Sequence, residues 1–218
     1  MNNEQQYNYL LNFLTDDKIE KFSTLIHLKT EYILPVFEDI YQFRNAAAIV
    51  RSLEGLGVNK MVALEGKNFF KPEESVSRGA EKWLKIERKP HTLESLLEIK
   101  SKGYSIVSVS PEKDALDIEN VSINKPIALI FGTEWEGVSQ EVLDISDACV
   151  KIPMYGFTQS YNVSVATAIS VYSLMNRIRN SEIKWQLSEE YKLEMQLYWA
   201  KNSIQSSKLI LDKHNAKN

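Results

Sequence analysis

Hydrophobic positions along the chain follow two different periodicities. Short apolar runs typical of buried strands lie at 32–39, 58–66, 83–88, 104–110, 126–132 and 148–154. Between them, apolar residues recur at helical spacing over 45–57, 75–83, 92–103 and 139–146. Strands that alternate with helices predict an α/β fold with a mostly parallel sheet and helices on both of its faces.

The two ends of the chain have a purely helical pattern. Residues 4–29 place leucine, isoleucine and phenylalanine at roughly helical spacing, and no strand is predicted after Ser188. We therefore predict an N-terminal helical extension at 1–30, an α/β domain at 31–180 and a C-terminal helical extension at 181–218.

Residues 162–180 predict a helix that is apolar or small nearly all round. Such a helix is buried on more than one side, either in a large single core or against a second molecule. The second possibility predicts a homodimer.

Composition narrows the functional classes only a little. The chain has 218 residues, 44% of them hydrophobic, and a net charge of −3, which gives no global sign of a nucleic-acid partner. Cys149 is the only cysteine, so no internal disulfide can form. No apolar run approaches membrane-spanning length, and the N-terminus lacks the features of a signal peptide. We expect a cytoplasmic protein without a membrane partner.

Several common sites are missing from the sequence. The Gly-x-Gly at 55–57 ends a predicted helix, whereas a dinucleotide fingerprint opens one. Gly66-Lys67 lacks the other residues of a phosphate-binding loop, and no Gly-x-Ser-x-Gly is present. The three histidines have no metal-ligand spacing, so we predict no metal site.

Unusual loops follow the predicted strands, where open α/β sheets bind ligands. Asn45 and Arg51 form an N-x5-R pattern, "FGTEWEG" spans 131–137, and "IPMYGFTQSYNVSVA" spans 152–166. In this order and spacing they resemble the three motifs of the SpoU/TrmH RNA 2′-O-ribose methyltransferases, in the SPOUT superfamily. "SRGAEKWLKIER" (77–88) and "LSEEYKLEMQLYWA" (187–200) resemble the branch that methylates guanosine 18 of tRNA.

The resemblance implies a fold and an activity that local patterns do not. The expected fold has a deep trefoil knot in the C-terminal part of the sheet, and the expected assembly is a homodimer. The expected reaction transfers a methyl group from S-adenosylmethionine to a ribose 2′-hydroxyl of tRNA, at guanosine 18 in the D-loop. Two alternatives stay open: the same reaction on ribosomal RNA, and a non-catalytic RNA-binding relative.

The motifs also imply individual residue roles. The implied cofactor-binding residues are Val109, Gly132, Ile152, Met154 and Tyr161. Tyr161 stands where the family usually has leucine.

The implied catalytic residues are Arg51, Asn45, Glu134, Ser160 and Asn162. Arg51 matches the arginine proposed to activate the ribose hydroxyl. Because a guanidinium stays protonated in proteins, a phosphate clamp is the alternative role. Asn45, Ser160 and Asn162 could instead be simple helix caps.

A local cluster of cations is the candidate RNA-binding surface. It comprises Arg78, Lys82, Lys85, Arg88 and Lys89. Such a cluster indicates phosphate contacts, although it is equally typical of an ordinary solvated surface.

Overall fold

The computed structural model describes residues 1–112 and 114–216, which divide into two compact units. One unit comprises residues 30–185, and the other combines residues 1–29 with residues 186–218.

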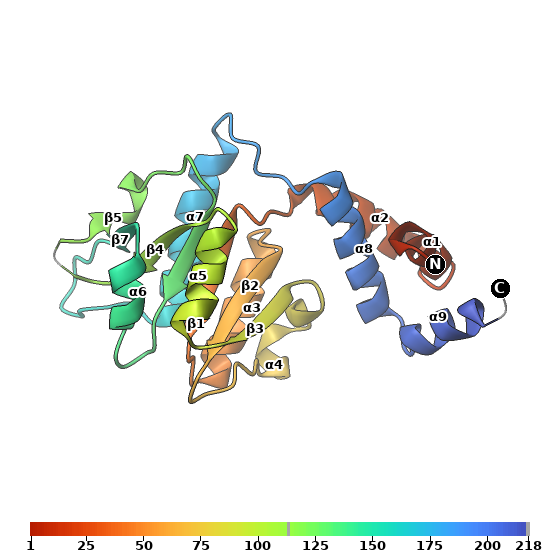
Figure 1. Ribbon diagram of the computed structural model, residues 1–218, viewed down its shortest axis with the longest axis horizontal. Coiled ribbons are helices and arrows are strands. Elements are labelled where there is room, and N and C mark those ends of the chain that lie inside the picture. The colour runs from red at the N-terminus through yellow and green to blue at the C-terminus, as the bar shows by residue number, and fades with distance from the viewer. Residues whose placement is uncertain (113, 217–218) are drawn as a thin grey trace. The chain divides into compact units, whose positions relative to one another are not determined.

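The larger unit is built on a seven-stranded sheet in the order β3-β2-β1-β6-β4-β7-β5 (Figure 1). The strands are β1 (Ile33–Glu38), β2 (Lys60–Glu65), β3 (Lys85–Pro90), β4 (Ser105–Val109), β5 (Leu116–Asp117), β6 (Ile127–Phe131) and β7 (Ala148–Lys151). Every neighbouring pair of these strands is parallel. Their carboxyl ends therefore meet at one edge of the sheet, where loops can form a site.

Helices cover both faces of this sheet. Ile33 and Phe37 of β1 belong to a core shared with α3 (Phe43–Gly55) and α7 (Val163–Arg179). Leu34 and Val36 point to the opposite face and pack with α5 (Leu93–Ser101) and α6 (Gln140–Ile145). Because both faces are buried, the central strands β1, β2 and β6 are nearly continuous apolar runs rather than alternating ones. The predicted α/β fold is confirmed.

Side-chain caps fix where three of these helices begin. Thr92 Oγ1 accepts from the Ser95 amide at the start of α5, and Ser139 Oγ accepts from the Val142 amide at the start of α6, both at 3.3 Å. Asn162 Oδ1 accepts from the Ser164 amide at 2.9 Å at the start of α7. Each cap satisfies an amide that the helix itself leaves without a partner.

Two predicted helices are broken in the structure. Residues 4–29 form α1 (Asn3–Leu11), α2 (Asp16–Leu25) and a short 3-10 turn, η1 (Ile26–Leu28). The extended backbone of Thr15 starts α2 as a new helix. Residues 75–83 form α4 (Glu74–Ser77) and η2 (Ala80–Lys82), because Arg78 and Gly79 have positive φ values of 55° and 84°. The short β5 and the 3-10 turn η3 (Ile118–Asn120) were not predicted.

The smaller unit is helical, as the end patterns predict. It contains α1, α2, α8 (Glu189–Ser203) and α9 (Ser207–Asn215). Leu10, Phe22 and Trp199 are buried there, and the rings of Phe22 and Trp199 are 5.4 Å apart.

Candidate functional site

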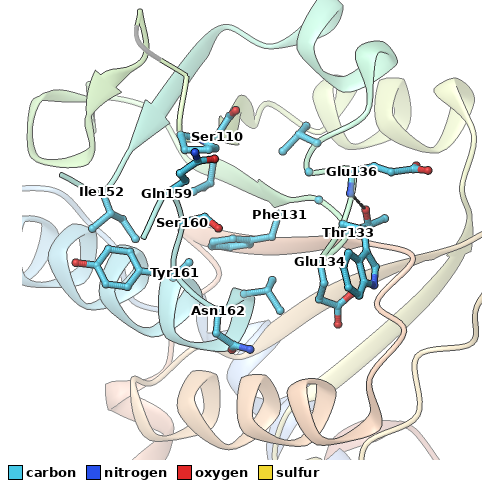
Figure 2. Close-up of a pocket in the computed structure, with 18 of the residues that line it drawn as sticks. Ser110, Phe131, Thr133, Glu134, Glu136, Ile152, Gln159, Ser160, Tyr161 and Asn162 are labelled. Carbon is cyan, nitrogen blue, oxygen red and sulfur yellow. Dashed lines mark hydrogen bonds between the residues drawn. The ribbon is translucent and has the colours of Figure 1, made fainter. Parts of the chain in front are cut away.

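A pocket of about 600 Å³ opens at the carboxyl ends of three neighbouring strands (Figure 2). Its walls are the segments that follow β4, β6 and β7, together with the first residues of α3 and α7. The strands end at Val109, Phe131 and Lys151, and all three residues line the pocket. The parallel sheet therefore brings together loops that are far apart in sequence.

The cofactor-binding residues predicted from the motifs all lie in this pocket. Its lining includes Val109, Gly132, Ile152, Met154 and Tyr161. Tyr161 is 39% exposed, so the position that departs from the family pattern is at the open part of the pocket. Of the predicted catalytic residues, Asn45, Glu134, Ser160 and Asn162 also line it.

A chain of hydrogen bonds joins the three motifs. Asn45 Nδ2 donates to Glu134 Oε1 at 3.0 Å, and Asn162 Nδ2 donates to Asn45 Oδ1 at 3.1 Å. Asn162 Oδ1 in turn accepts from the amide and the hydroxyl of Ser164. Asn45 is only 8% exposed, so these bonds satisfy amide groups that water hardly reaches. The chain fixes the relative positions of α3, the loop after β6 and the start of α7.

The structure changes the alternative roles of the two asparagines. The N-cap of α3 is Gln42, so Asn45 lies inside the first turn and its simple capping role is wrong. Asn162 does cap α7, and the same side chain also bonds to Asn45. Figure 2 shows Asn162 and Ser160 on the segment that leads into α7.

Glu134 lies at the amino end of α3. Its two carboxylate oxygens accept from the amides of Tyr41 and Gln42, each at 3.4 Å. A negative charge is favourable at a helix N-terminus, where amides lack partners. Glu134 therefore holds the loop after β1 against the loop after β6.

Gly132 is required by the backbone itself. A Cβ atom at this position would lie 1.9 Å from the carbonyl oxygen of Gly137. Two backbone hydrogen bonds close this tight loop. The Thr133 amide donates to the Gly137 carbonyl at 2.9 Å, and the Gly137 amide donates to the Thr133 carbonyl at 3.2 Å. Any side chain at 132 would open the loop that carries Glu134.

Arg51 is the one predicted catalytic residue that does not line the pocket of its own chain. It is exposed on α3, six residues after Asn45. Six helical residues correspond to about 9 Å along the axis and about 120° around it. Arg51 instead shares an exposed face of α3 with Arg44, seven residues earlier.

The predicted RNA-binding cations differ in how strongly they are paired. Arg88 Nε lies 3.2 Å from Glu65, and Arg88 Nη2 donates to the Phe70 carbonyl at 3.0 Å. Lys89 Nζ lies 2.6 Å from Glu98, and that hydrogen bond is the main cause of the raised pKa of Lys89. Arg78 and Lys82 are exposed. Arg88 and Lys89 thus have internal carboxylate partners that reduce their charge toward RNA.

The pocket has an acidic balance that the motif comparison does not predict. Its charged lining residues are Glu112, Glu134, Glu136 and Lys151, three carboxylates and one ammonium group. This excess of negative charge fits a small cationic ligand, since opposite charges attract in a partly enclosed site. Within the part of the chain that the structure describes, no group of three or more histidine, cysteine, aspartate or glutamate residues could hold a metal ion.

A model of the SpoU rRNA Methylase family matches residues 33–172, which contain all three motifs. This chain belongs to the SpoU methylase family. The resemblance predicted from the motifs is therefore confirmed. No helix among the described residues is long and apolar enough to span a membrane.

Similar proteins cover nearly the whole chain. The tRNA (guanosine(18)-2'-O)-methyltransferase of Borreliella burgdorferi is 39% identical over 92% of this chain and 92% of its own length. The enzyme of the same name from Aquifex aeolicus is 30% identical, over 87% and 91% of the two chains. The crystal structure of the A. aeolicus TrmH/SpoU tRNA modifying enzyme has a TM-score of 0.79 and covers 88% of this chain and 98% of that one.

A more distant structure contains a bound cofactor. The SpoU methyltransferase AviRb of Streptomyces viridochromogenes was crystallised in complex with AdoMet, and it has a TM-score of 0.63 at 21% identity. The match covers 72% of this chain and 64% of the AviRb chain. At this identity the likeness shows a shared fold alone.

Proposed function

We propose that this protein transfers a methyl group from S-adenosylmethionine to the ribose 2′-hydroxyl of guanosine 18 in tRNA. The observation that carries the proposal is the hydrogen-bond chain from Glu134 through Asn45 to Asn162, which joins the three motif segments around one pocket. The names of the relatives that match over most of the chain supply the substrate.

The pocket suits S-adenosylmethionine in size and charge. Its volume of about 600 Å³ is within the usual range for small-molecule sites. When bound, the cofactor supplies a methyl group activated by a positively charged sulfur. Val109, Ile152, Met154 and Tyr161 provide apolar and backbone contacts, and the carboxylates around the pocket favour its positive charge.

The polar residues have positioning and binding roles in this proposal. Glu134 and Asn45 hold the loops in place, and Asn162 fixes the start of α7 beside the pocket. The hydroxyl of Ser160 is exposed in the pocket, where it can hydrogen-bond the target ribose. Arg51 cannot take the proton from the 2′-hydroxyl because its guanidinium stays protonated. We assign to Arg51 a bidentate contact with an RNA phosphate, and the proton goes to that phosphate or to water.

A homodimer is part of the proposal. Four residues of the segment that leads into and forms α7 follow one another at intervals of three or four, the spacing of one helical face, and are only partly covered: Tyr161, Val165, Ile169 and Tyr172. An apolar stripe of this kind is typical of an interface. Sedimentation should show twice the mass of the 25.1 kDa chain, and Val165→Asp should convert the dimer to the monomer. A monomeric wild-type protein at micromolar concentration contradicts this.

We also infer the trefoil knot that the family resemblance implies. It is supported by the sheet order, in which β7 lies between β4 and β5 while the chain after β7 continues to α7 beside α3. An experimental structure traced through 109–163 tests the inference.

The decisive experiment compares RNA substrates. Purified protein and labelled S-adenosylmethionine are incubated with a tRNA transcript, the same transcript with adenosine at position 18, and ribosomal RNA. We expect 2′-O-methylguanosine, located by mass spectrometry, only in the first transcript. The family model carries the name of an rRNA methylase, so methylation of ribosomal RNA alone would replace the proposed substrate. If no methyl group is transferred to any of these RNAs, the protein is a non-catalytic relative of the family's enzymes.

A further inference from the structure

Next to the pocket lies a groove of about 610 Å³ that combines aromatic and cationic side chains. Six of its lining residues define what we call the basic aromatic groove: Tyr41, Phe43, Phe69, Arg44, Lys67 and Lys71. Tyr41 lies between β1 and α3, Phe43 and Arg44 begin α3, and the other three lie between β2 and α4.

The aromatic rings of the groove are unusually exposed. Phe69 is 78% exposed, Tyr41 64% and Phe43 53%. The neighbouring Phe70 is only 2% exposed and packs in the core, so the chain turns Phe69 outward at this point. Three exposed aromatic side chains around one groove indicate a binding surface.

The cations of the groove are largely available to a ligand. Lys67 and Lys71 are exposed and form no ion pair with any residue in 1–112 or 114–216. Arg44 lies 3.4 Å from Glu73, with both side chains open to solvent, a geometry that contributes little stability. The groove therefore presents an excess of positive charge beside its rings.

Hydrogen bonds preform the groove. Asp39 has a positive φ of 45°, and its Oδ1 accepts from the amides of Gly66 at 2.7 Å and Asn68 at 3.1 Å. Asn68 Nδ2 donates back to the Asp39 carbonyl at 3.3 Å. The end of β1 is thus tied to the loop that carries Lys67 and Phe69.

The groove adjoins the pocket. Gln42 lines both, and Glu134 of the pocket holds the amides of Tyr41 and Gln42. A nucleotide whose ribose reaches the pocket therefore has its neighbour in the strand at the groove.

We propose that the basic aromatic groove binds the nucleotides that flank the methylated guanosine. Their bases stack on Phe69 and Tyr41, and Lys67 and Lys71 contact their phosphates. Single-stranded loops are recognised in this way, because unstacked bases have an apolar face and the backbone is anionic. This inference rests on the proposed function and adds the part of the loop that the protein holds.

The first test uses variants of Phe69, a side chain exposed enough that its replacement leaves the core intact. Loss of one base–aromatic stack should weaken tRNA binding roughly 5- to 150-fold in Phe69→Ala. Phe69→Leu keeps an apolar side chain without a π-face and should also bind weakly, while Phe69→Trp should restore affinity. Equal affinity of Phe69→Leu and wild type would overturn the stacking.

The second test locates the contact on the RNA. A transcript with an abasic nucleotide beside guanosine 18 should bind the wild-type protein more weakly than normal tRNA, but should bind Phe69→Ala no worse than normal tRNA does. 2-Aminopurine at the same position should differ in fluorescence between its complexes with wild-type protein and with Phe69→Ala. Additive effects of the two changes would place Phe69 away from that nucleotide.

The third test concerns the lysines. Lys67→Ala combined with Lys71→Ala should weaken binding to any tRNA and lower the salt dependence of log Kd by about 1.4 to 1.8, as expected for two lost phosphate contacts. The matched control is Lys125→Ala, an exposed lysine before the amino end of β6, at the opposite edge of the sheet. Equal effects of the control and the double variant would overturn the groove as the phosphate contact.

Failure of the groove can be distinguished from failure of the function. If wild-type protein methylates guanosine 18 and the groove variants bind and react normally, the groove inference is wrong and the enzyme assignment stands. If wild-type protein methylates no tRNA but binds it through Phe69, the proposed function is wrong and the groove remains an RNA-binding site. Unchanged tRNA binding in all groove variants would also fit a protein segment as the occupant, which overturns the inference.

Discussion

The pocket and the basic aromatic groove share Gln42 but have opposite charge balances. The charged residues of the pocket are Glu112, Glu134, Glu136 and Lys151, whereas those of the groove are Arg44, Lys67, Lys71 and Glu73. The first suits a cationic cofactor and the second an anionic backbone. Two ligands of opposite charge can therefore meet at one point without competing for the same surface.

The two regions also differ in how their side chains are held. In the pocket, Glu134, Asn45 and Asn162 bind one another, so their geometry does not depend on a ligand. In the groove, Phe69, Lys67 and Lys71 project into solvent from a backbone that Asp39 holds in place. Reaction requires precise placement, while binding of a flexible loop tolerates side chains that adjust.

Arg51 gives the largest expected effect on this comparison. Arg51→Lys keeps the charge but loses the planar fork, so a bidentate phosphate contact in the transition state would be lost. We expect single-turnover methylation to fall roughly 30- to 1000-fold, a loss of about 2–4 kcal/mol. Cofactor affinity, measured by calorimetry on the same preparation, should barely change.

The matched control is Arg44→Lys, on the same exposed face of α3 but within the groove. It should weaken tRNA binding slightly and leave the single-turnover rate at saturating tRNA unchanged. If Arg51→Lys behaves like this control, Arg51 belongs to the binding surface and not to the reaction.

The hydrogen-bond chain of the pocket can be broken at Asn45. Asn45→Ala leaves the polar groups of Glu134 and Asn162 without their partner. Misplaced loops should lower kcat/KM about 100-fold, and the unfolding free energy should fall by about 1–3 kcal/mol. Methyl transfer and thermal unfolding measure the two effects.

A second variant at Asn45 keeps the size of the side chain and changes its charge. Asn45→Asp keeps an acceptor for Asn162 but places a carboxylate beside Glu134, so the pair should share a proton. Its activity relative to wild type should rise as the pH falls. A constant ratio from pH 6 to pH 9 would argue that Asn45 does not act through Glu134.

Asp39 tests the frame of the groove. Burial raises the pKa of Asp39. Hydrogen bonds from the amides of Gly66, Asn68 and Lys67 together lower it by more than burial raises it, so the pKa lies below the ordinary value. A depressed pKa stabilises the fold above the ordinary pKa of aspartate, about 4, and this stability is lost as the pH falls through the folded-state value.

Asp39→Asn tolerates the positive φ and keeps an acceptor. It should cost about 1 kcal/mol at neutral pH, and the difference from wild type should shrink as the pH falls below the ordinary pKa of aspartate. Chemical unfolding at several pH values measures this. A difference independent of pH would assign the loss to packing and not to the charge.

The sequence predicts the pocket far better than the groove. The central strands β1, β2 and β6 are nearly continuous apolar runs because both sheet faces are covered there, and the motifs point to loops that follow strands of this sheet. Lys67 and Phe69 lie between the motifs, in a segment without a recognisable pattern. Their approach to Tyr41 depends on the positive φ of Asp39, a tertiary feature that local propensity does not indicate.

Broken helices show the same limit on a smaller scale. Residues 4–29 keep a helical spacing of apolar residues although the chain turns before Thr15. The motif match also could not predict where Arg51 lies relative to the pocket. The match gives the spacing of residues along the chain, but it does not give the face of α3 on which Arg51 lies. Both depend on backbone geometry rather than on residue type.

The smallest expected effect concerns the acidic side of the comparison. Glu136 is an exposed carboxylate of the pocket, so its attraction for a cation is screened by water. S-adenosylmethionine carries a positive sulfur that its product, S-adenosylhomocysteine, lacks. Glu136→Gln should therefore weaken binding of the cofactor about two- to fivefold, corresponding to less than about 1 kcal/mol, and leave binding of the product unchanged. Calorimetry with both ligands at low and moderate salt gives the ratio of cofactor affinity to product affinity. This ratio in Glu136→Gln should approach the wild-type ratio as the salt concentration rises. Equal weakening of both ligands would mean that Glu136 shapes the loop after β6 and does not act through its charge.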